Sequence, residues 1–249
     1  AICFRIQAPV EPFLVKKLSE GEDATVLYAK VKSAFNAAQM VGTFAMGPFL
    51  DRFGGRIGFV LAFSSGVCSY SLLAMAETMD MVYLSKVPSA FMHPFLVAQA
   101  FMSQHTSQND IAEALALLVT AYTIGATIGP LIGGYLGASG DYALGAKVSA
   151  GGLFLNVLLA ILFLGGETGE GVQNKHEKIA GTAKAPHGSF LIGYRKVVTN
   201  PAVLLVLMTK ICSSTLNSVF ETIFPVILSD NFSLKQQEMG YVFSASQLL

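Results

Sequence analysis

The sequence predicts an all-α integral membrane protein, and its composition, its mean hydropathy and its long apolar stretches all support that fold class. Of the 249 residues, 53% are hydrophobic and only 13% are charged, whereas a soluble domain normally carries about 25% charged residues. The mean hydropathy is +0.56. Because a water-facing surface needs charged side chains, this composition favours a chain whose outer surface faces lipid.

Apolar stretches long enough to cross a bilayer, about 20 residues each, recur along the whole chain. They lie near residues 1–18, 32–50, 57–77, 79–103, 111–138 and 143–165, then near 200–228 and from about 238 onward. The segment from Leu153 to Leu164 carries Asn156 as its single polar residue, so it cannot supply the polar stripe of a soluble helix. Both ends of the chain are apolar and no signal peptide is recognisable, so we expect a fragment cut within helices.

One long polar connector, residues 166–199, divides these stretches into two groups. We expect residues 1–165 to form an N-terminal six-helix transmembrane bundle, and residues 200–249 to form the truncated start of a C-terminal bundle. The connector is expected to be a cytoplasmic central loop. Apolar residues alternate with Arg195 and Lys196 near its end, which predicts a short amphipathic helix lying in the membrane interface.

Polar residues inside the apolar stretches are candidates for a substrate or proton pathway. A charge at the bilayer centre costs about 2.5–3.5 kcal/mol on insertion scales, so it normally faces a partner or a water-filled cavity. Several of these residues repeat at helical spacing and so share one face of their helix. The predicted pathway residues are Arg5, Glu11, Gln39, Lys86, His93, Lys210, Asn217 and Glu221.

Two features qualify this set. Hydrogen bonding between helices is an alternative role for the Ser, Thr and Asn residues of the spans, and His93 is equally compatible with packing. The first span also contains Pro9, between Arg5 and Glu11, and Pro12, next to Glu11. An interrupted helix next to charged groups is a common way to build a midplane binding site.

The connector after the second stretch carries a recognisable pattern, Gly-Pro-Phe-Leu-Asp-Arg-Phe-Gly-Gly-Arg at residues 47–56. It resembles the G-x-L-A-D-R-x-G-R-K signature of the major facilitator superfamily. The matching residues are Gly47, Asp51, Arg52, Gly54 and Arg56, while Leu50 and Gly55 depart from the signature. The resemblance implies a charge lock between helices that alternating access breaks and remakes. An ordinary tight turn with flanking charges is the alternative.

The fifth stretch contains a second pattern, which is similar to the G-x-x-x-G-P-x-x-G-G antiporter motif of the same superfamily. All of the specified residues are present, namely Gly125, Gly129, Pro130, Gly133 and Gly134. Small residues four apart let helix backbones approach closely. In the superfamily this motif is characteristic of exporters that exchange substrate for protons.

Lys86 stands where the fourth-span motif has arginine, which departs from the proton-relay pattern. Residues 84–93 look like the fourth span of the tetracycline-resistance-like carriers of solute carrier family 22.

The resemblance implies a major facilitator fold of twelve spans in two six-helix bundles, of which this chain would hold the first bundle and the start of the second. The first, fourth and seventh helices would line a central cavity. The expected function is secondary active transport of a small organic solute, a drug or an organic ion, by proton-coupled antiport. Glu11 or Glu221 would carry the proton, and Lys86, His93 and Lys210 would orient the solute. A non-transporting membrane receptor or scaffold that keeps the fold is the alternative.

Other function classes find no support in the sequence. The net charge is zero, so no basic surface is predicted for nucleic acid. The segment from Gly140 to Lys147 misses the phosphate-binding loop pattern, because its lysine is one place late and Val148 follows it. The three cysteines form no metal-ligand pattern. We therefore expect no enzyme activity, cofactor, metal or nucleotide, and we expect the bilayer, a solute and protons as partners, in the plasma membrane or an endomembrane.

Overall fold

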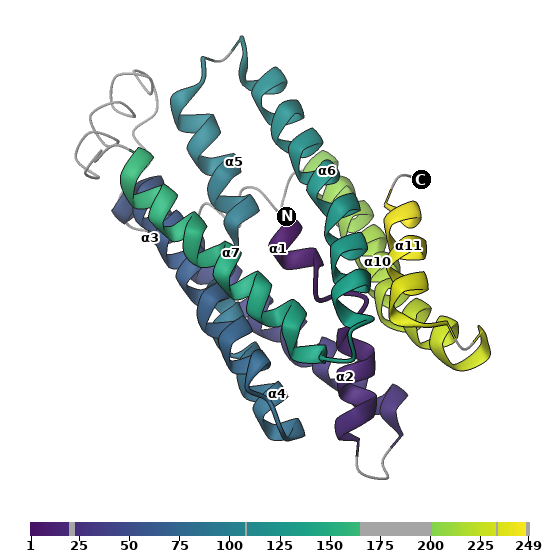
Figure 1. The fold of residues 1–249 in the computed structure, drawn as a ribbon. Coiled ribbons are helices and arrows are strands. Elements are labelled where there is room, and N and C mark those ends of the chain that lie inside the picture. The colour runs from purple at the N-terminus through teal and green to yellow at the C-terminus, as the bar shows by residue number, and fades with distance from the viewer. Residues whose placement is uncertain (20–22, 108, 165–200, 233, 248–249) are drawn as a thin grey trace.

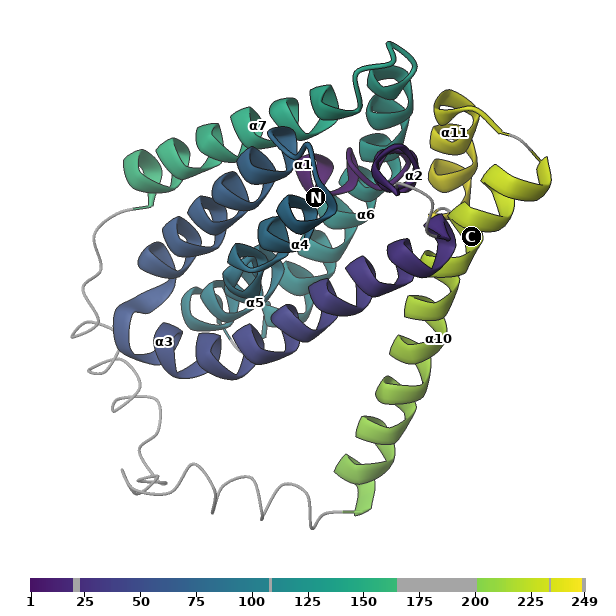
Figure 2. The same cartoon turned by 90° about the horizontal axis from the view of Figure 1, so that it is seen from below.

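The computed structural model describes residues 1–19, 23–107, 109–164, 201–232 and 234–247. Its described elements are helices, most of which form one bundle, whereas the first half of α10 extends away from it (Figures 1 and 2). The predicted central loop at 166–199, with its interfacial helix, lies outside the described residues. Four of the described helices, α3, α6, α7 and α10, are long and apolar enough to cross a membrane. The prediction of an all-α membrane protein is thus supported helix by helix.

The first predicted span is broken into two short helices, α1 (Ile2–Arg5) and α2 (Glu11–Leu18). Residues 6–10 between them contain Pro9. Pro12 stands in the first turn of α2, where its missing N–H would have had no partner in any case. The interruption expected from the prolines is therefore present. It places Arg5 and Glu11 at the two ends of the break.

The second and third predicted spans are two helices joined directly at Gly54, and together they carry the label α3 (Ala24–Ala74). Figure 2 shows its two limbs diverging from the bend, with α4 and α5 between them in that view. Gly54 bends the chain with φ 78° and ψ 171°, a conformation that glycine reaches without the steric cost of a side chain. The break between the two spans therefore falls inside the connector expected at 51–56, but Gly54 alone makes the turn and the residues on either side of it are helical. The first limb begins at Ala24 rather than near residue 32.

The fourth predicted span, 79–103, is not one helix. It consists of α4 (Met79–Lys86), the short 3₁₀ helix η1 (Pro88–Phe91) and α5 (Pro94–His105). The prediction of a continuous helix is wrong because Pro88 and Pro94 remove backbone donors and clash with the preceding turn. Gln39 of α3 donates from Nε2 to the carbonyl oxygens of Ser89 at 2.7 Å and Met92 at 3.3 Å. These bonds satisfy backbone groups that the break exposes.

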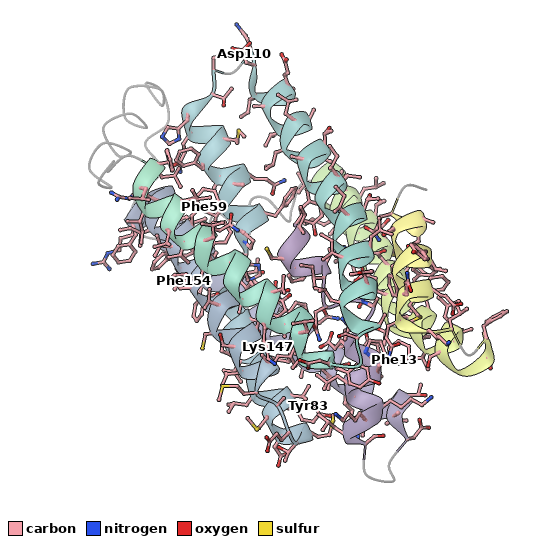
Figure 3. The ribbon with its side chains drawn as sticks, in the orientation of Figure 1. Phe13, Phe59, Tyr83, Asp110, Lys147 and Phe154 are labelled. Atoms are coloured by element: carbon pink, nitrogen blue, oxygen red, sulfur yellow. The ribbon has the colours of Figure 1, made fainter. Side chains whose placement is uncertain are left out.

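The remaining helices follow the predicted spans closely. They are α6 (Ile111–Gly137), α7 (Tyr142–Phe163), α10 (Pro201–Phe232) and α11 (Gln236–Ser246). The connection between α5 and α6 ends at Asp110, at the tip of the molecule in Figure 3. α11 lies beside α6, and α10 lies at the edge of the structure with its C-terminal half near the start of α3 (Figure 2).

Large apolar side chains cover the outer faces of these helices. Phe154 of α7, labelled in Figure 3, is 55% exposed, and Phe163 is 80% exposed. A soluble monomer rarely exposes apolar surface on this scale, whereas lipid tails accommodate it. The interior core packs α2, the two limbs of α3, α4 and α7 around buried residues that include Val15, Tyr28, Val31, Tyr70, Val82 and Leu153.

The start of α7 offers a test of local structure outside the spans. Asp141 caps the helix by accepting a hydrogen bond from the Ala143 N–H at 2.9 Å. This bond, reinforced by Lys147 at 3.2 Å, lowers the pKa of Asp141 below its ordinary value of 3.8. We expect Asp141→Ala to cost about 1 kcal/mol at neutral pH, as other N-cap replacements do.

The pH dependence of that loss follows from the direction of the pKa shift. Because the folded-state pKa is depressed, the stabilisation is complete above the unfolded value of 3.8 and is lost as pH falls through the lower folded-state value. Denaturant titration of the full-length wild type and the Asp141→Ala variant in mixed micelles, at pH 7 and below pH 3, measures the difference. An equal difference at both pH values would contradict this role.

Candidate functional site: a charged cavity between the first helices and α10

A cavity of about 90 Å³ lies where the break between α1 and α2 meets α3, α4, α10 and α11. The space is large enough to hold several waters. Its charged lining residues are Arg5, Glu11, Lys32, Lys86 and Glu221. Four of these stand in the predicted pathway set, and Lys32 is an addition.

Glu11 is the centre of the cavity's charge network. Its Oε1 accepts a hydrogen bond from Nζ of Lys86, and its Oε2 lies 3.2 Å from Nζ of Lys32. Glu11 is only 5% exposed, so its negative charge is stabilised by these two lysines rather than by bulk water. Lys32 also lies over the ring of Tyr28, 5.4 Å from its centroid. One carboxylate therefore holds two ammonium groups drawn from two other helices.

A second ion pair crosses from the start of the chain to α10. Arg5 Nη1 donates to Glu221 Oε1 at 2.9 Å. Beside it, Asn36 Nδ2 of α3 donates to Ser218 Oγ of α10 at 3.0 Å. These contacts link α1 and α3 to a helix that follows them by more than 180 positions in the sequence. The cavity is thus closed on one side by polar links to α10.

Gln7 is a lining residue that the sequence analysis did not select. It is 3% exposed, and within the described part of the chain neither its amide nitrogen nor its amide oxygen has a hydrogen-bond partner. A Cβ added at Gly145 of α7 would come within 2.9 Å of its Oε1, so the glycine leaves room for this amide. The signal available in the sequence was the four-residue spacing from Gln7 to Glu11.

Lys32 was also within reach of sequence reasoning. It shares one face of the second predicted span with Asn36, Gln39 and Thr43. Its ion pair with Glu11 depends on how α2 packs against α3, and the sequence alone does not show that packing.

Four predicted pathway residues lie outside the cavity. Gln39 supports the break in the fourth span, as described above. His93, also at that break, has Nε2 3.5 Å from Thr43 Oγ1. Lys210 and Asn217 are exposed on α10. Of the three pathway residues predicted on α10, Glu221 is the one that lines the cavity in this conformation. Ser218 and Thr222 of the same helix line the cavity beside it.

The pattern at residues 47–56 surrounds the hairpin bend of α3. Gly54 makes the bend, and Arg56 Nη2 donates to the carbonyl oxygen of Ile161 on α7 at 2.8 Å. Arg52 lies over the ring of Phe53 at 5.4 Å. Asp51 forms no ion pair with a described residue. A Cβ at Gly47 would meet no other atom within 4 Å. In this conformation Arg56 joins α3 to α7, and the predicted lock on Asp51 is not formed within the described residues.

The glycine-rich pattern of α6 forms two close helix contacts. A Cβ at Gly129 or Gly133 would lie 2.9 Å and 1.8 Å from the carbonyl oxygens of Ile2 and Ile6, and Gly125 also faces α1. On another face, a Cβ at Gly134 would lie 2.9 Å from the Cα of Gly240 on α11. Ser244 of α11 donates to the carbonyl oxygen of Thr127 at 2.6 Å. The small residues therefore allow α6 to pack directly against both α1 and α11.

Comparison with known proteins decides the family. The family model described as Major Facilitator Superfamily matches residues 2–249. The chain belongs to the Major Facilitator Superfamily. The resemblance seen in the two glycine-containing patterns is confirmed.

Curated proteins similar to this chain share about one aligned residue in four with it. Human solute carrier family 67 member A1 is 25% identical over 252 residues, and mouse solute carrier family 22 member 18 is 26% identical over 253 residues. These alignments cover 99% and 97% of this chain, but 58% and 59% of the relatives. The tetracycline resistance protein, class C, of Escherichia coli is 25% identical over 167 residues, covering 66% of this chain and 41% of that protein.

Superfamily membership establishes the coarse biology of the chain. It is a multi-pass membrane protein of a family made up of transporters rather than enzymes. Within the described residues, no group of three or more His, Cys, Asp or Glu is placed to hold a metal ion. The chain spans less than three fifths of the length of the solute carriers named above, so the activity of the whole protein is a matter for proposal.

Proposed function

We propose that the full-length protein is a secondary active transporter that exchanges a small organic solute for protons by alternating access. The observation that carries this proposal is the cavity, because five charged side chains line one space at a break in the first span and beside α10. Charged groups buried within membrane helices usually mark a transport pathway, and interrupted helices commonly build the binding site of such carriers. Residues 1–165 would be the N-terminal bundle, 166–199 the central loop and 200–249 the start of the C-terminal bundle.

Glu221 is our candidate for the proton-carrying group. Its ion pair with Arg5 at 2.9 Å joins α1 of the proposed first bundle to α10 of the second. A proton on Glu221 removes the negative charge that faces Arg5, which weakens the link between the bundles. Protonation and rocking of the bundles are coupled in this way by one contact. Glu221 is also the more exposed partner, with 34% of its side chain accessible against 16% for Arg5.

Two observations support exchange as the mode of transport. The glycine-rich pattern of α6 matches the antiporter motif of the superfamily at each specified position and seats α6 between α1 and α11. Several relatives are named for resistance, including the tetracycline resistance protein of Escherichia coli and multidrug resistance protein 1 of Bacillus subtilis. Resistance by a carrier implies outward movement of a solute, which exchange for entering protons would drive.

Replacing Glu221 with glutamine tests the coupling. We expect solute-dependent proton flux in proteoliposomes of the full-length protein to fall by about 5- to 150-fold, the range of typical coupling free energies. Exchange of solute for solute is expected to persist, because it needs no proton. The measurement follows internal pH with a dye while organic cations, anions and neutral solutes are added in turn.

Glu113→Gln is the matched control, since Glu113 is an exposed acid on α6. Unchanged proton flux in Glu221→Gln would remove Glu221 from the mechanism. Folded wild-type protein that moves neither protons nor any solute of the panel, beside a working control carrier, would favour the receptor or scaffold function instead.

A further inference from the structure

We propose that the cavity binds an organic monoanion, with Lys32 holding its negative group and Gln7 a neutral polar group. This inference rests on the proposed function, because it names the class of solute that the transporter would carry. It is drawn from the charges, contacts and burial of the lining residues.

The charges of the cavity do not balance. Three cationic side chains, Arg5, Lys32 and Lys86, face two carboxylates, Glu11 and Glu221. Among the described residues, these five are the charged ones that line the cavity. The cavity therefore has one positive charge in surplus. In a membrane interior an uncompensated charge is costly, and a bound monoanion brings the cavity to neutrality. A monovalent cation would instead raise the surplus to two.

The contacts show where the surplus lies. Arg5 and Glu221 form a one-to-one pair at 2.9 Å. Glu11 is shared, because its two oxygens contact Lys86 and Lys32 separately. The excess charge therefore belongs to the two lysines. Lys32 is the more accessible, with 23% of its side chain exposed against 10% for Lys86, so we assign the anionic group to Lys32.

Gln7 indicates that the bound solute also carries an uncharged polar group. Its amide is buried and lines the same cavity, and both its donor and its acceptor lack a partner among the described residues. Leaving a buried donor or acceptor unpaired costs free energy, which a ligand hydroxyl or amide recovers. A solute with a carboxylate and such a group would therefore complete both the charge and the hydrogen bonding of the site.

The test compares small molecules that share one ring and differ in charge. Purified full-length protein is titrated with benzoate, benzylammonium and benzyl alcohol, and the apparent melting temperature is measured at each concentration. We expect benzoate to raise the melting temperature and the other two probes to have little effect. 4-Hydroxybenzoate, which adds a hydroxyl, is expected to bind more tightly than benzoate, and Gln7→Leu is expected to remove that advantage.

Variants on α3 separate the site from general charge effects. We expect Lys32→Gln to weaken apparent benzoate affinity about tenfold or more. Lys32→Arg is expected to retain binding. Lys30→Gln makes the same charge change two residues away, at an exposed position that does not line the cavity, and is expected to leave binding unchanged. The melting temperature of each variant without a probe shows whether it is folded.

The outcomes distinguish this inference from the proposed function. Stabilisation by benzylammonium equal to or greater than that by benzoate would overturn the anion class, and so would the absence of stabilisation by any probe. Equal weakening in Lys32→Gln and Lys30→Gln would overturn the assignment to Lys32. Anion binding and uptake without proton flux would uphold this inference while refuting proton coupling. Proton flux driven only by cations would do the reverse.

Discussion

Replacing Glu11 with glutamine is expected to destabilise the protein by about 3–5 kcal/mol, the usual loss when one partner of a buried ion pair is removed. Glu11 is 5% exposed, and its carboxylate contacts both Lys86 and Lys32. Without it, two ammonium groups face each other in a space that their own helices enclose. Denaturant titration of the full-length protein in mixed micelles measures the loss. Solute transport is expected to fall with it, since Glu11 organises the cavity.

A second substitution separates the loss of charge balance from a general fragility of α2. In Glu11→Gln/Lys86→Gln the carboxylate and its most buried partner are removed together, so the surplus positive charge of the cavity returns to one. We expect this double variant to recover more than half of the stability lost in Glu11→Gln. Glu113→Gln, at an exposed position of α6, should cost little. A double variant as unstable as Glu11→Gln would contradict the electrostatic explanation.

Replacing Gly133 with alanine is expected to cost about 3 kcal/mol, the upper end of the usual loss from overpacking. The added Cβ would lie 1.8 Å from the carbonyl oxygen of Ile6. This neighbour is backbone, so it cannot move aside as a flexible side chain would, and α1 must shift away from α6. Because that shift displaces Arg5 and Gln7 from the cavity, we expect solute transport by the full-length protein to be lost. Melting temperature and proteoliposome uptake are the two measurements.

Gly151→Ala is the matched control for Gly133→Ala. Gly151 also lies within a membrane helix, but a Cβ there would meet no other atom within 4 Å. Alanine is preferred to glycine in a helix by about 1 kcal/mol, so this variant is expected to be neutral or slightly more stable. Wild-type stability and uptake in Gly133→Ala would show that α1 and α6 do not need this close approach.

Much of the helical architecture was predictable because it follows from local properties of the chain. Length and hydropathy located α6, α7 and α10 closely. The prolines of the first span predicted its interruption, since the effect of proline on a helix depends on its own turn. Pro88 and Pro94 break the fourth span in the same way, although its apolar length predicted one helix. At residues 51–56 charged side chains favoured a loop, whereas Gly54 alone makes the turn.

The composition of the cavity was less predictable. Helical spacing placed Lys210, Asn217 and Glu221 on one face. Because α10 contacts the other described helices from Ser218 to Val226, Lys210 and Asn217 stay exposed. Gln39 and His93 lie at the break in the fourth span. Gln7 carries no charge and so gave no signal as strong as that of Arg5 or Glu11. In the structure its amide is buried and has no hydrogen-bond partner among the described residues.

The sequence by itself determined that this is a helical membrane protein of the major facilitator type, because apolar length and glycine spacing act within one helix or between helix backbones. Only the tertiary structure decided which charges meet. Glu11 and Lys86 are 75 positions apart, and Arg5 and Glu221 are 216 apart. Which residues form ion pairs depends on how α2, α4 and α10 pack, and no local sequence pattern predicts that packing. The surplus charge that leads us to propose an anionic solute is therefore a property of the folded molecule.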